Sequence, residues 1–412
     1  MAGAREALQL VLNVGSSSIK YALYRSSAGA AGAAPAFRRL VQGLAEGIGT
    51  ADHCRIKHET EGGKEKHEVP LPDHRAALAA VMGLLPADAK RGVGSVGHRV
   101  VHGGEAFREA AVVDASVLKA IEAATALAPL HNPWGLLGIR ASAELFGADC
   151  PQVAVFDTAF HQTMPPHAFL YALPYDMYER HGIRKYGFHG TSYQYVLGRT
   201  AELLGKPADE VNCIVCHIGN GASMAAIRRG RCVDTTMGLT PLEGLVMGTR
   251  SGDLDPAVPM HLMNSLGYSA KETADLLNKR SGLLGLCGTS DDREIEQRCF
   301  DQEPQGLLAK RVQVHRMRKY LGAFLVALEG EVDALVFCGG MAEKSHLLRT
   351  MVCENLGSLG FSLDESRNRA DGGRFSAETP IHPQGASGAQ VWVVPTDEEL
   401  CIAQQARALV HA

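Results

Sequence analysis

Short runs of alternating or continuous apolar residues recur along this chain, and each predicts a β-strand. Two of them, Leu8–Val14 and Ile19–Arg25, flank the polar turn "GSSS" near the start. Further runs follow at 95–104, 152–161, 212–230, 333–340 and 391–396. We expect these segments to form sheets, with a hairpin turn between the first two strands.

Apolar residues at helical spacing fill the intervals between these strands. They predict helices over 115–128, 135–146, 192–204 and 306–328. Ser269 with Glu272, and Thr396 with Glu399, have capping-box spacing and predict two further helix starts. The alanine- and glycine-rich stretch 28–34 has neither pattern, so we expect a hairpin loop there. Strands that alternate with helices indicate an α/β protein.

Two strand–turn–strand segments, half a chain apart, are similar to each other. They are "LVLNVGSSSIKYALYR" from Leu10 and "IVCHIGNGASMAAIRR" from Ile214. Aligned without a gap, Gly15 matches Gly219 and Ala22 matches Ala226. Two unrelated hairpins would also give this pattern, but the match favours a duplication into two similar domains.

Composition excludes some classes of partner. The 412 residues suffice for two or three domains, and 41 basic against 45 acidic residues give a net charge of −4. Without a basic block, nothing indicates binding to nucleic acid or to a membrane surface. No apolar stretch approaches the ~18 residues of a membrane span, and the first residues lack the apolar core of a signal peptide. We therefore expect no nucleic-acid and no membrane partner.

Ten cysteines in a chain of this length are ordinary for a reducing compartment, so we expect a cytoplasmic protein. Cys213 and Cys216 have the spacing of a redox or zinc pair. They lie on a predicted strand, where positions i and i+3 point to opposite faces. We expect them to be buried structural thiols.

Two motifs of known chemistry occur in an unsuitable structural context, and a third is absent. Ser17 and Lys20 have the S-x-x-K spacing of penicillin-binding enzymes, but they lie on a predicted hairpin and not on a helix. "GVGSVG" at 92–97 precedes a strand, the reverse of the order in a dinucleotide-binding loop. No G-x-x-x-x-G-K-[ST] is present, so a nucleotide is not held by a P-loop.

Glycine-rich hairpin turns are the remaining candidates for a phosphate site. "GSSS", "GNGAS" and "CGGMAEKS" each follow an apolar strand. Their backbone amides and hydroxyls could hold an anion, although each alone could equally be an ordinary tight turn.

Eight longer segments carry a resemblance to a known family. They are "NVGSSSIK", "GHRVVHGGE", "LAPLHNP", "VAVFDTAFHQTMP", "KYGFHGTS", "CHIGNGAS", "TPLEGLVMGTRSGDLDP" and "PTDEELCIA". In this order, from about Leu10 to Ala403, they resemble the acetate kinase family. The match covers nearly the whole chain, and its motifs are together very specific.

The resemblance implies the fold of acetate and sugar kinases, Hsc70 and actin. This fold has two duplicated α/β domains of ribonuclease H-like type, which face each other across a cleft. The expected N-terminal domain is 1–157, completed by a C-terminal helix at 395–412 that packs back on it. The expected C-terminal domain, 158–394, would carry the nucleotide site and a dimer interface.

The implied reaction is the reversible transfer of the ATP γ-phosphoryl group to acetate, giving acetyl phosphate and ADP. It implies Mg²⁺, or Mn²⁺ in its place, and a homodimer. A propionate or other short-chain acyl kinase is the nearest alternative, because one methylene changes binding by only ~1–3 kcal/mol. A nucleotide-switched binding module and a phosphatase-like hydrolase are the alternatives of other classes.

By the same resemblance, the residues of the transfer are Arg99, His131, Asp157, His189 and Arg250. Transfer between two anions depends on positive charge and alignment, which suits the two arginines and a histidine just before a helix N-terminus. Acetate is already ionised at pH 7. We therefore expect Asp157 to orient an arginine or a metal-bound water, and not to remove a proton. Taken alone, each of these residues would more often be structural.

The resemblance also assigns binding residues. Asn13 and Glu398 are the expected metal ligands, and Mg²⁺ prefers such oxygen donors, although the helix dipole alone favours an acid in a first turn. Glu398 is expected to approach Asn13 from the C-terminal helix. The expected acyl pocket consists of Val101, Leu130, Phe188 and Pro241. The expected nucleotide contacts are Ser16, Ser18, Lys20, His217, Ile218, Gly219, Asn220, Gly221, Asp291, Asp292, Arg293, Gly340, Met341, Ala342, Glu343 and Lys344.

Three segments depart from the family pattern. "GMAEKS" replaces the usual G-I-G-E-N-S, "HNPWG" replaces "HNPPN", and "GLCGTSDDRE" is atypical. These changes concern nucleotide preference and affinity more than the chemistry of transfer.

Overall fold

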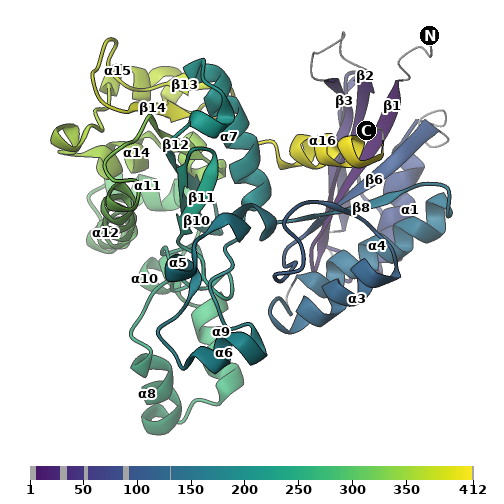
Figure 1. Cartoon of the computed structure of the whole chain (residues 1–412), viewed down its shortest axis with the longest axis horizontal. Helices are drawn as coiled ribbons and strands as arrows, with labels where there is room; N and C mark the ends of the chain where they lie inside the picture. Colours follow the sequence, from purple (N-terminus) through teal and green to yellow (C-terminus); the bar gives the residue numbers. More distant parts are fainter. Residues whose placement is uncertain (1–5, 28–34, 51–53, 87–91, 130, 411–412) are drawn as a thin grey trace. The chain divides into compact units, whose positions relative to one another are not determined.

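The computed structural model describes residues 6–27, 35–50, 54–86, 92–129 and 131–410. The chain forms two compact units, which are described separately here (Figure 1). Unit 1 contains residues 1–160 and 397–412, and unit 2 contains residues 161–396. The predicted loop at 28–34 lies outside the described residues. No helix in the described ranges is long and apolar enough to cross a membrane.

Unit 1 is built on an eight-stranded sheet with the order β5-β4-β3-β2-β1-β6-β8-β7. Strands β1 to β5 are antiparallel neighbours, β1, β6 and β8 run parallel, and β7 is antiparallel to β8. The strands are β1 (Ala7–Val14), β2 (Ser18–Ser27), β3 (Ala36–Glu46), β4 (Arg55–Thr60), β5 (Gly63–His67), β6 (Val93–Val100), β7 (Ala111–Val112) and β8 (Gln152–Phe156).

Helices cover both faces of this sheet, because alternate strand residues are apolar on each side. One core gathers Leu10, Leu12 and Tyr21 with α1, and the opposite one gathers Val11 and Ala22 with α16. The helices of unit 1 are α1 (His74–Leu84), α3 (Ala115–Ala123), α4 (Asn132–Phe146) and α16 (Glu398–Val410).

The C-terminal helix α16 packs back on the sheet of unit 1, as predicted. A Cβ on Gly97 would lie 2.6 Å from Ile402 Cγ2, so the glycine allows α16 to lie close to β6. Arg407 Nη1 donates to Ser26 Oγ at 2.6 Å and fixes the far end of the helix.

Unit 2 contains a six-stranded sheet with the order β11-β10-β9-β12-β14-β13. The strands are β9 (Cys213–Ile218), β10 (Ala222–Arg228), β11 (Arg231–Thr235), β12 (Ala334–Cys338), β13 (Thr379–Pro380) and β14 (Gln390–Val393). The helices are α5 (Pro166–Phe169), α6 (Tyr175–His181), α7 (Gly190–Leu204), α8 (Ala257–Leu266), α9 (Ala270–Lys279), α10 (Gly282–Cys287), α11 (Asp292–Phe300), α12 (Pro304–Ala327), α13 (Gly340–Lys344), α14 (His346–Cys353) and α15 (Glu365–Asn368).

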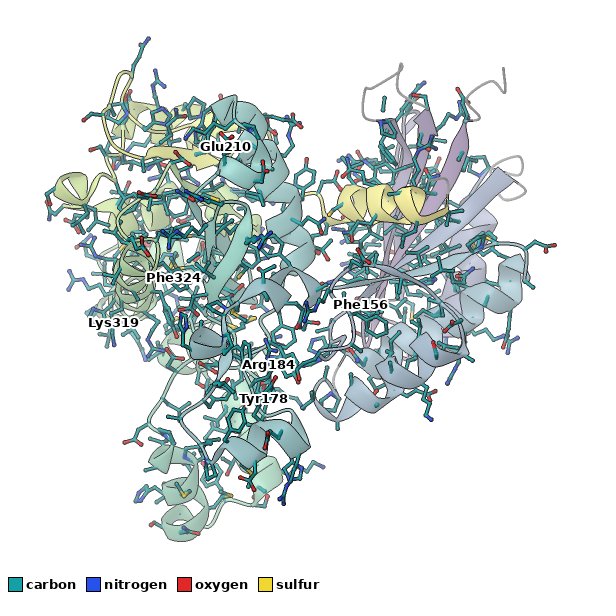
Figure 2. All side chains as sticks on the ribbon, in the orientation of Figure 1. Phe156, Tyr178, Arg184, Glu210, Lys319 and Phe324 are labelled. Atoms are coloured by element: carbon teal, nitrogen blue, oxygen red, sulfur yellow. The ribbon has the colours of Figure 1, made fainter. Side chains whose placement is uncertain are left out.

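The long helix α12 illustrates how unit 2 buries its apolar residues. Phe324 is fully buried in the core, whereas Lys319 is exposed on the same helix (Figure 2). Cys213 and Cys216 are buried free thiols on β9, as predicted.

The two sheets share one topology. The strands β3-β2-β1-β6-β8 of unit 1 and β11-β10-β9-β12-β14 of unit 2 have the same order and the same directions. Each is three antiparallel strands followed by two that run parallel to the first. This repeated topology confirms the duplication that the two hairpins predicted.

The gap-free alignment of the two hairpins is wrong by one residue after the turn. Val11 pairs with Ala22, whereas Val215, its equivalent, pairs with Ala225 and not with Ala226. The reason is that the second turn has one residue fewer between its paired strand ends.

The four predicted helices are observed, with boundaries shifted by a few residues; α3, for example, ends at Ala123 and continues as a short 3₁₀ turn, Ala124–Ala126. The capping box of Ser269 and Glu272 forms at the start of α9. The second predicted box is wrong, because the Asp397 carboxylate and not Thr396 accepts from the amide of Leu400, at 2.9 Å.

Candidate active site

In unit 1, an ion pair lies at the carboxyl ends of two parallel strands, where open α/β sheets place their ligand sites. Arg99 near the end of β6 donates from Nε and Nη2 to the two carboxylate oxygens of Asp157, at 3.0 and 2.6 Å. The Asp157 side chain is 1% exposed and that of Arg99 is 20% exposed. Burial alone would lower the pKa of Arg99, but the charges of Asp157 and Glu398 raise it above its usual range. The guanidinium therefore stays charged and fixed.

The expected metal ligands Asn13 and Glu398 both belong to unit 1. Asn13 is next to the end of β1, where it pairs with Lys20 of β2, and Glu398 is the first residue of α16. An amide oxygen and a carboxylate are hard donors that suit Mg²⁺, which usually keeps several waters. Among the described residues, no three or more His, Cys, Asp or Glu side chains gather as a metal centre.

The turn after β1 contains the expected phosphate contacts Ser16 and Ser18. The Gly15 amide donates to the Ser18 carbonyl at 2.8 Å and closes the turn, while Ser16 is exposed. Lys20 extends toward α16, where its ammonium binds the Glu399 carboxylate at 2.8 Å. Glu399 therefore partners Lys20, which explains why it does not complete a capping box with Thr396.

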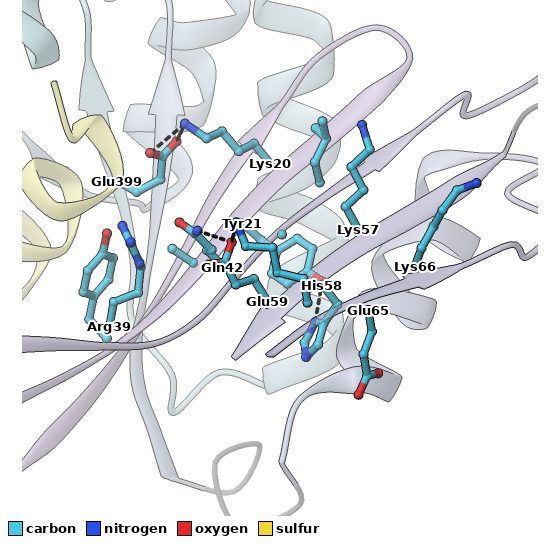
Figure 3. A pocket seen from close by; sticks show the side chains of 15 residues that line it. Lys20, Tyr21, Arg39, Gln42, Lys57, His58, Glu59, Glu65, Lys66 and Glu399 are labelled. Atoms are coloured by element: carbon cyan, nitrogen blue, oxygen red, sulfur yellow. Dashed lines mark hydrogen bonds and ion pairs between the residues drawn. The ribbon is translucent and has the colours of Figure 1, made fainter. Parts of the chain in front are cut away.

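A hollow of about 520 Å³ adjoins Lys20 on the outer strands β2 to β5 (Figure 3). Its lining includes Lys20, Glu399, Arg39 and Lys57, and Gln42 Nε2 donates to Glu59 across it at 2.7 Å. No local pattern indicates this hollow, because its residues come from four separate strands and from α16.

His131 precedes α4, and its neighbour Asn132 is bonded to the segment just after β6, the strand that carries Arg99. The neighbouring Asn132 amide group accepts from the His102 amide at 3.1 Å and donates to the His102 carbonyl at 2.9 Å. Val101, an expected residue of the acyl pocket, lies in a bend after the end of β6 and is not part of the strand that carries Arg99. Leu130 lies outside the described residues.

In unit 2, His189 and Arg250 meet at the turn between β9 and β10. A Cβ placed on Gly221 would lie 3.7 Å from His189 Nε2 and 3.6 Å from Arg250 Nη1. The same Arg250 nitrogen donates to the Pro241 carbonyl at 3.2 Å. Two nitrogen-bearing side chains thus converge on a glycine turn of the kind that binds anions.

His189 is held in an unusual backbone conformation just before α7. Its φ is 61°, in the left-handed region that few residues other than glycine adopt. His189 Nδ1 lies 2.8 Å from Ser223 Oγ, which also contacts the Tyr193 hydroxyl, and its ring stacks on His217 at 4.2 Å. Burial raises the pKa of Tyr193 well above its usual value, so this hydroxyl stays protonated.

His217 is anchored at the end of β9. Its Nδ1 lies 2.8 Å from Ser192 Oγ on α7, and the same hydroxyl lies 2.8 Å from Thr396 Oγ1. The Thr396 hydroxyl is therefore bonded to Ser192 and does not form the predicted cap of α16.

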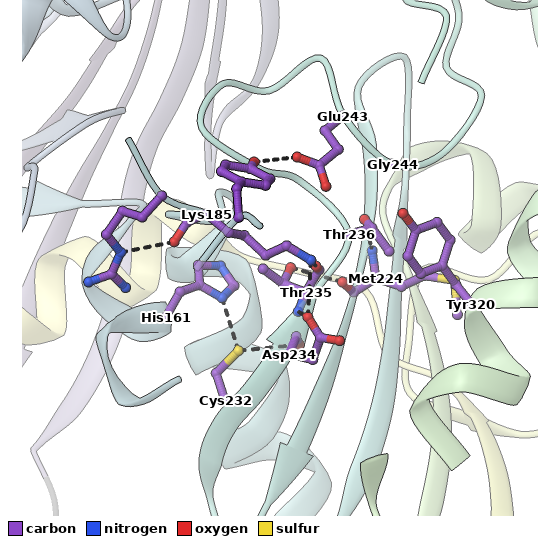
Figure 4. A network of polar contacts seen from close by, with 12 residues as sticks. His161, Lys185, Met224, Cys232, Asp234, Thr235, Thr236, Glu243, Gly244 and Tyr320 are labelled. Carbon is purple, nitrogen blue, oxygen red and sulfur yellow. Dashed lines mark hydrogen bonds and ion pairs between the residues drawn. The ribbon is translucent and has the colours of Figure 1, made fainter. Parts of the chain in front are cut away.

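His161 supports the turn that carries His189, and its contact with Cys232 is drawn in Figure 4. His161 Nε2 lies 2.9 Å from the Phe188 carbonyl, and its Nδ1 lies 3.1 Å from Cys232 Sγ. Since a carbonyl only accepts, the ring proton is on Nε2, and Nδ1 accepts from the thiol. Gly187 has φ 78°, and a Cβ there would lie 2.6 Å from the His161 ring, so only glycine allows this packing.

The expected nucleoside contacts line a cavity of about 500 Å³ within unit 2. Its lining includes Gly219, Asn220, Asp291, Asp292, Arg293, Gly340, Met341 and Lys344, together with Ser290, Glu296 and Arg374. Arg293 forms an ion pair with Asp291 at 2.6 Å, and buried Lys310 binds Asp292 at 2.5 Å.

Ala342 and Glu343 support this cavity and do not line it. Ala342 is fully buried, and the Glu343 carboxylate accepts from the amides of Gly339 at 2.8 Å and Thr396 at 3.2 Å. Ile218 and Phe188 are buried as well. These residues pack beneath the turns and hold their backbone in place.

Sequence reasoning missed several residues of these sites. Ser223, Tyr193 and His161 support His189, and Glu296 and Arg374 line the nucleoside cavity. Four of them had a local signal: Ser223 ends the "GNGAS" turn, His161 lies within the segment "VAVFDTAFHQTMP", Tyr193 follows His189 by one helical turn, and Glu296 follows Arg293 on α11. Arg374 had none, because it reaches the cavity from a segment far away in the sequence.

Comparisons with known proteins agree with this arrangement. Residues 8–404 match the model of the acetokinase family. The acetate kinase of Thermotoga maritima is 48% identical over 413 aligned positions, which cover 98% of each chain. Among solved structures, Porphyromonas gingivalis acetate kinase has a TM-score of 0.88 at 41% identity and covers 98% of this chain and 100% of its own. A propionate kinase from Francisella tularensis also has a TM-score of 0.88, at 39% identity, over 98% and 99% of the two chains.

Proposed function

The chain belongs to the acetokinase family and acts as a phosphotransferase on acetate, and from this premise we propose how its residues carry the reaction. ATP and acetate give acetyl phosphate and ADP, reversibly. The observation that carries the proposal is the approach of His189 Nε2 and Arg250 Nη1 to Gly221. Donors fixed at a glycine turn suit the charge that develops on the oxygens of a phosphoryl group in transfer.

His189 acts as a neutral donor in this proposal. Tyr193 donates to Ser223, and Ser223 in turn donates to His189 Nδ1, which leaves the ring proton on Nε2. The contacts of Ser223 with both residues support this direction, as does the raised pKa of Tyr193. The left-handed backbone at His189 then aims Nε2–H at the phosphoryl oxygens.

In unit 1, Arg99 binds the carboxylate of acetate, and Asp157 holds the guanidinium in place. The two hydrogen bonds between them support a positioning role for Asp157. No base is required, since acetate is already ionised at pH 7. His131 assists from the start of α4. Val101, Leu130, Phe188 and Pro241 are the proposed apolar surroundings of the acyl group, and their size would set the preference between acetate and propionate.

The nucleotide is held by turns and by the cavity of about 500 Å³. Ser16, Ser18 and Lys20 of unit 1, and 217–221 of unit 2, are the proposed phosphate contacts. Residues 291–293 and 340–344 surround the nucleoside. Asn13 and Glu398 would hold Mg²⁺, or Mn²⁺, which when bound neutralises phosphate charge.

We also propose a homodimer formed through unit 2. Helix α8 buries none of its residues, and it exposes Val258, Met260, Met263 and Leu266. An exposed apolar stretch of this kind typically marks an interaction site.

Ten free cysteines, nine of them buried, support a reducing compartment such as the cytoplasm. The functional domains proposed are 1–157 with 395–412, and 158–394.

The activity is tested by trapping acyl phosphate with hydroxylamine. Reactions contain ATP, Mg²⁺ and either acetate, propionate, butyrate or no acid. We expect acyl phosphate with acetate, less with propionate, and no ATP turnover without an acid. ATP hydrolysis that does not depend on any carboxylic acid would reject phosphoryl transfer and favour a hydrolase.

A further inference from the structure

The serine turn of unit 1 rests on a histidine from a distant helix. His74 is the first residue of α1 and is 7% exposed. Its Nε2 lies 2.7 Å from the carbonyl oxygen of Gly15, the residue that opens the turn. The imidazole is stacked on the indole of Trp134 from α4, with ring centres 4.8 Å apart and planes 20° apart. Two helices thus clamp one ring against the turn.

The proton of this contact can be assigned. A carbonyl oxygen only accepts, so His74 carries its proton on Nε2 and donates to Gly15. In a trans peptide the C=O and the following N–H point in opposite directions. Since the Gly15 carbonyl points to α1, the Ser16 N–H points away from α1, on the open side of the turn, where Ser16 is exposed.

Without the hydrogen bond from His74, the orientation of the Ser16 amide would be weakly fixed. The Gly15 amide is engaged with the Ser18 carbonyl, whereas among the residues that the structure describes the Gly15 carbonyl accepts from His74. Glycine permits a wide range of backbone angles, so the peptide between Gly15 and Ser16 can rotate at little cost. A donor that must meet a phosphate oxygen is effective only when it is held in place before binding.

We propose that His74 is a positioning residue for the phosphate turn, and that Trp134 holds its ring in the donating orientation. The proposal rests on the proposed function, because it takes the Ser16 amide as a contact of the nucleotide phosphates. It also gives a role to the segment "HNPWG", which places a tryptophan where the family pattern has proline. The chain pairs that tryptophan with the histidine of α1.

The competing explanation is that His74 and Trp134 only stabilise the contact between α1 and α4. Both helices contribute to one apolar core, which includes Ala77, Leu78 and Trp134. If the pair were purely structural, its loss would lower the melting temperature and change the KM values for ATP and acetate together. If the pair positions the turn, its loss would weaken the binding of the nucleotide alone.

Two variants of similar size separate these explanations. His74→Gln places an amide donor near the position of Nε2, whereas His74→Leu has no donor. For His74→Leu we expect the KM for ATP, and the Kd of ADP measured by calorimetry, to rise about five- to tenfold, as for one lost hydrogen bond. The KM for acetate should stay within twofold, and His74→Gln should restore most of the ADP affinity. Trp134→Leu should give a smaller rise, because the donor remains but its ring is less fixed.

Arg75→Ala is the matched control on the same turn of α1, since its side chain is exposed and forms an ion pair with Glu144 at the surface. It should change none of these values. The proposal is overturned if folded His74→Leu binds ADP like the wild type, or if Gln and Leu weaken binding equally. It is also overturned if ATP, acetate and melting temperature all change in parallel. Absence of acyl phosphate formation by the wild type would reject the proposed function instead, and ADP binding would still test His74.

Discussion

Arg99 and Asp157 face each other across the carboxyl ends of β6 and β8 through two parallel hydrogen bonds. A bidentate pair fixes the plane of the guanidinium as well as its position. The charge of Arg99 is secure at any pH that the protein survives, because Asp157 and Glu398 outweigh the effect of burial on its pKa. Asp157 is thereby engaged as a partner of Arg99, in a geometry that suits orientation.

The first prediction concerns this pair. Asp157→Asn keeps the shape of the side chain but removes the charge and one of the two acceptors. We expect the KM for acetate to rise about tenfold or more and kcat to fall, while ADP binding is retained, because breaking a charge-assisted pair costs ~1.5–3 kcal/mol. Steady-state kinetics and calorimetry measure these values. If Asp157 were a base, kcat would fall with an unchanged KM for acetate, and the pH profile would lose a limb.

Arg250 is predicted to act in the transition state. Arg250→Ala removes a donor that approaches the Gly221 turn, and we expect kcat to fall on the order of 10³-fold with a modest change in the KM for ATP. Arg250→Lys keeps the charge but not the planar fork, and should recover only part of the rate. A collapse of ATP affinity with preserved kcat would make Arg250 a binding residue only.

His161 is predicted to support His189 at a distance. His161→Leu removes the hydrogen bond to the Phe188 carbonyl and frees the turn that holds His189 in its left-handed conformation. We expect kcat to fall about tenfold or more with little change in either KM. His161→Gln retains a donor near Nε2 and should recover most of the rate, while Cys232→Ala should cost less than His161→Leu. Equal losses in the Gln and Leu variants, at equal melting temperature, would contradict this role.

The sequence predicts which residues lie at the ends of strands, but it does not predict contacts between elements that are distant in the chain. Asn13, Arg99 and His217 lie near the ends of apolar runs, so their place at the carboxyl edge of a sheet follows from strand prediction. The contact of His74 with Gly15 joins residues 59 positions apart through a helix packed on a sheet, and no local pattern encodes it. The same is true of the pair formed by Lys20 and Glu399.

The errors have physical reasons as well. Thr396 satisfies the spacing of a capping box, but its hydroxyl is used by Ser192. The adjacent Asp397 caps α16 in its place, and a carboxylate is an equally good cap. Spacing rules consider only side chains near the start of a helix as caps. A hydrogen bond to a residue elsewhere in the fold can occupy one of these side chains and leave the cap to its neighbour.

Stability in acid is predicted to depend on His98 of β6. This residue is buried and bonded to Gln152 at 2.8 Å, and burial lowers its pKa to about 4. The unfolded chain, in which the pKa of a histidine is about 6.5, binds more protons between these values. Stability should therefore fall as pH drops from about 6.5 to about 4, by roughly 3 kcal/mol, and this contribution should be constant below that range.

The variant His98→Gln tests this origin. Its amide can still donate to Gln152 but does not titrate. The difference in unfolding free energy between wild type and variant should change between pH 7 and pH 4, as measured by urea denaturation. A difference that is independent of pH would show that other groups cause the acid sensitivity.

The last prediction concerns association. Helix α8 exposes Met260 at 52% and Leu266 at 60%, an apolar surface that a second copy of the chain would cover in the proposed homodimer. Replacing both by glutamate would place two charges in an apolar contact, where unpaired charge is strongly unfavourable. We expect the double variant Met260→Glu, Leu266→Glu to sediment as a monomer while the wild type sediments as a dimer. Lys319→Glu, a charge change at an exposed position of α12, is the control and should leave the dimer intact. A wild type that is monomeric at micromolar concentration would contradict the homodimer, and a double variant that stays dimeric would place the interface away from α8.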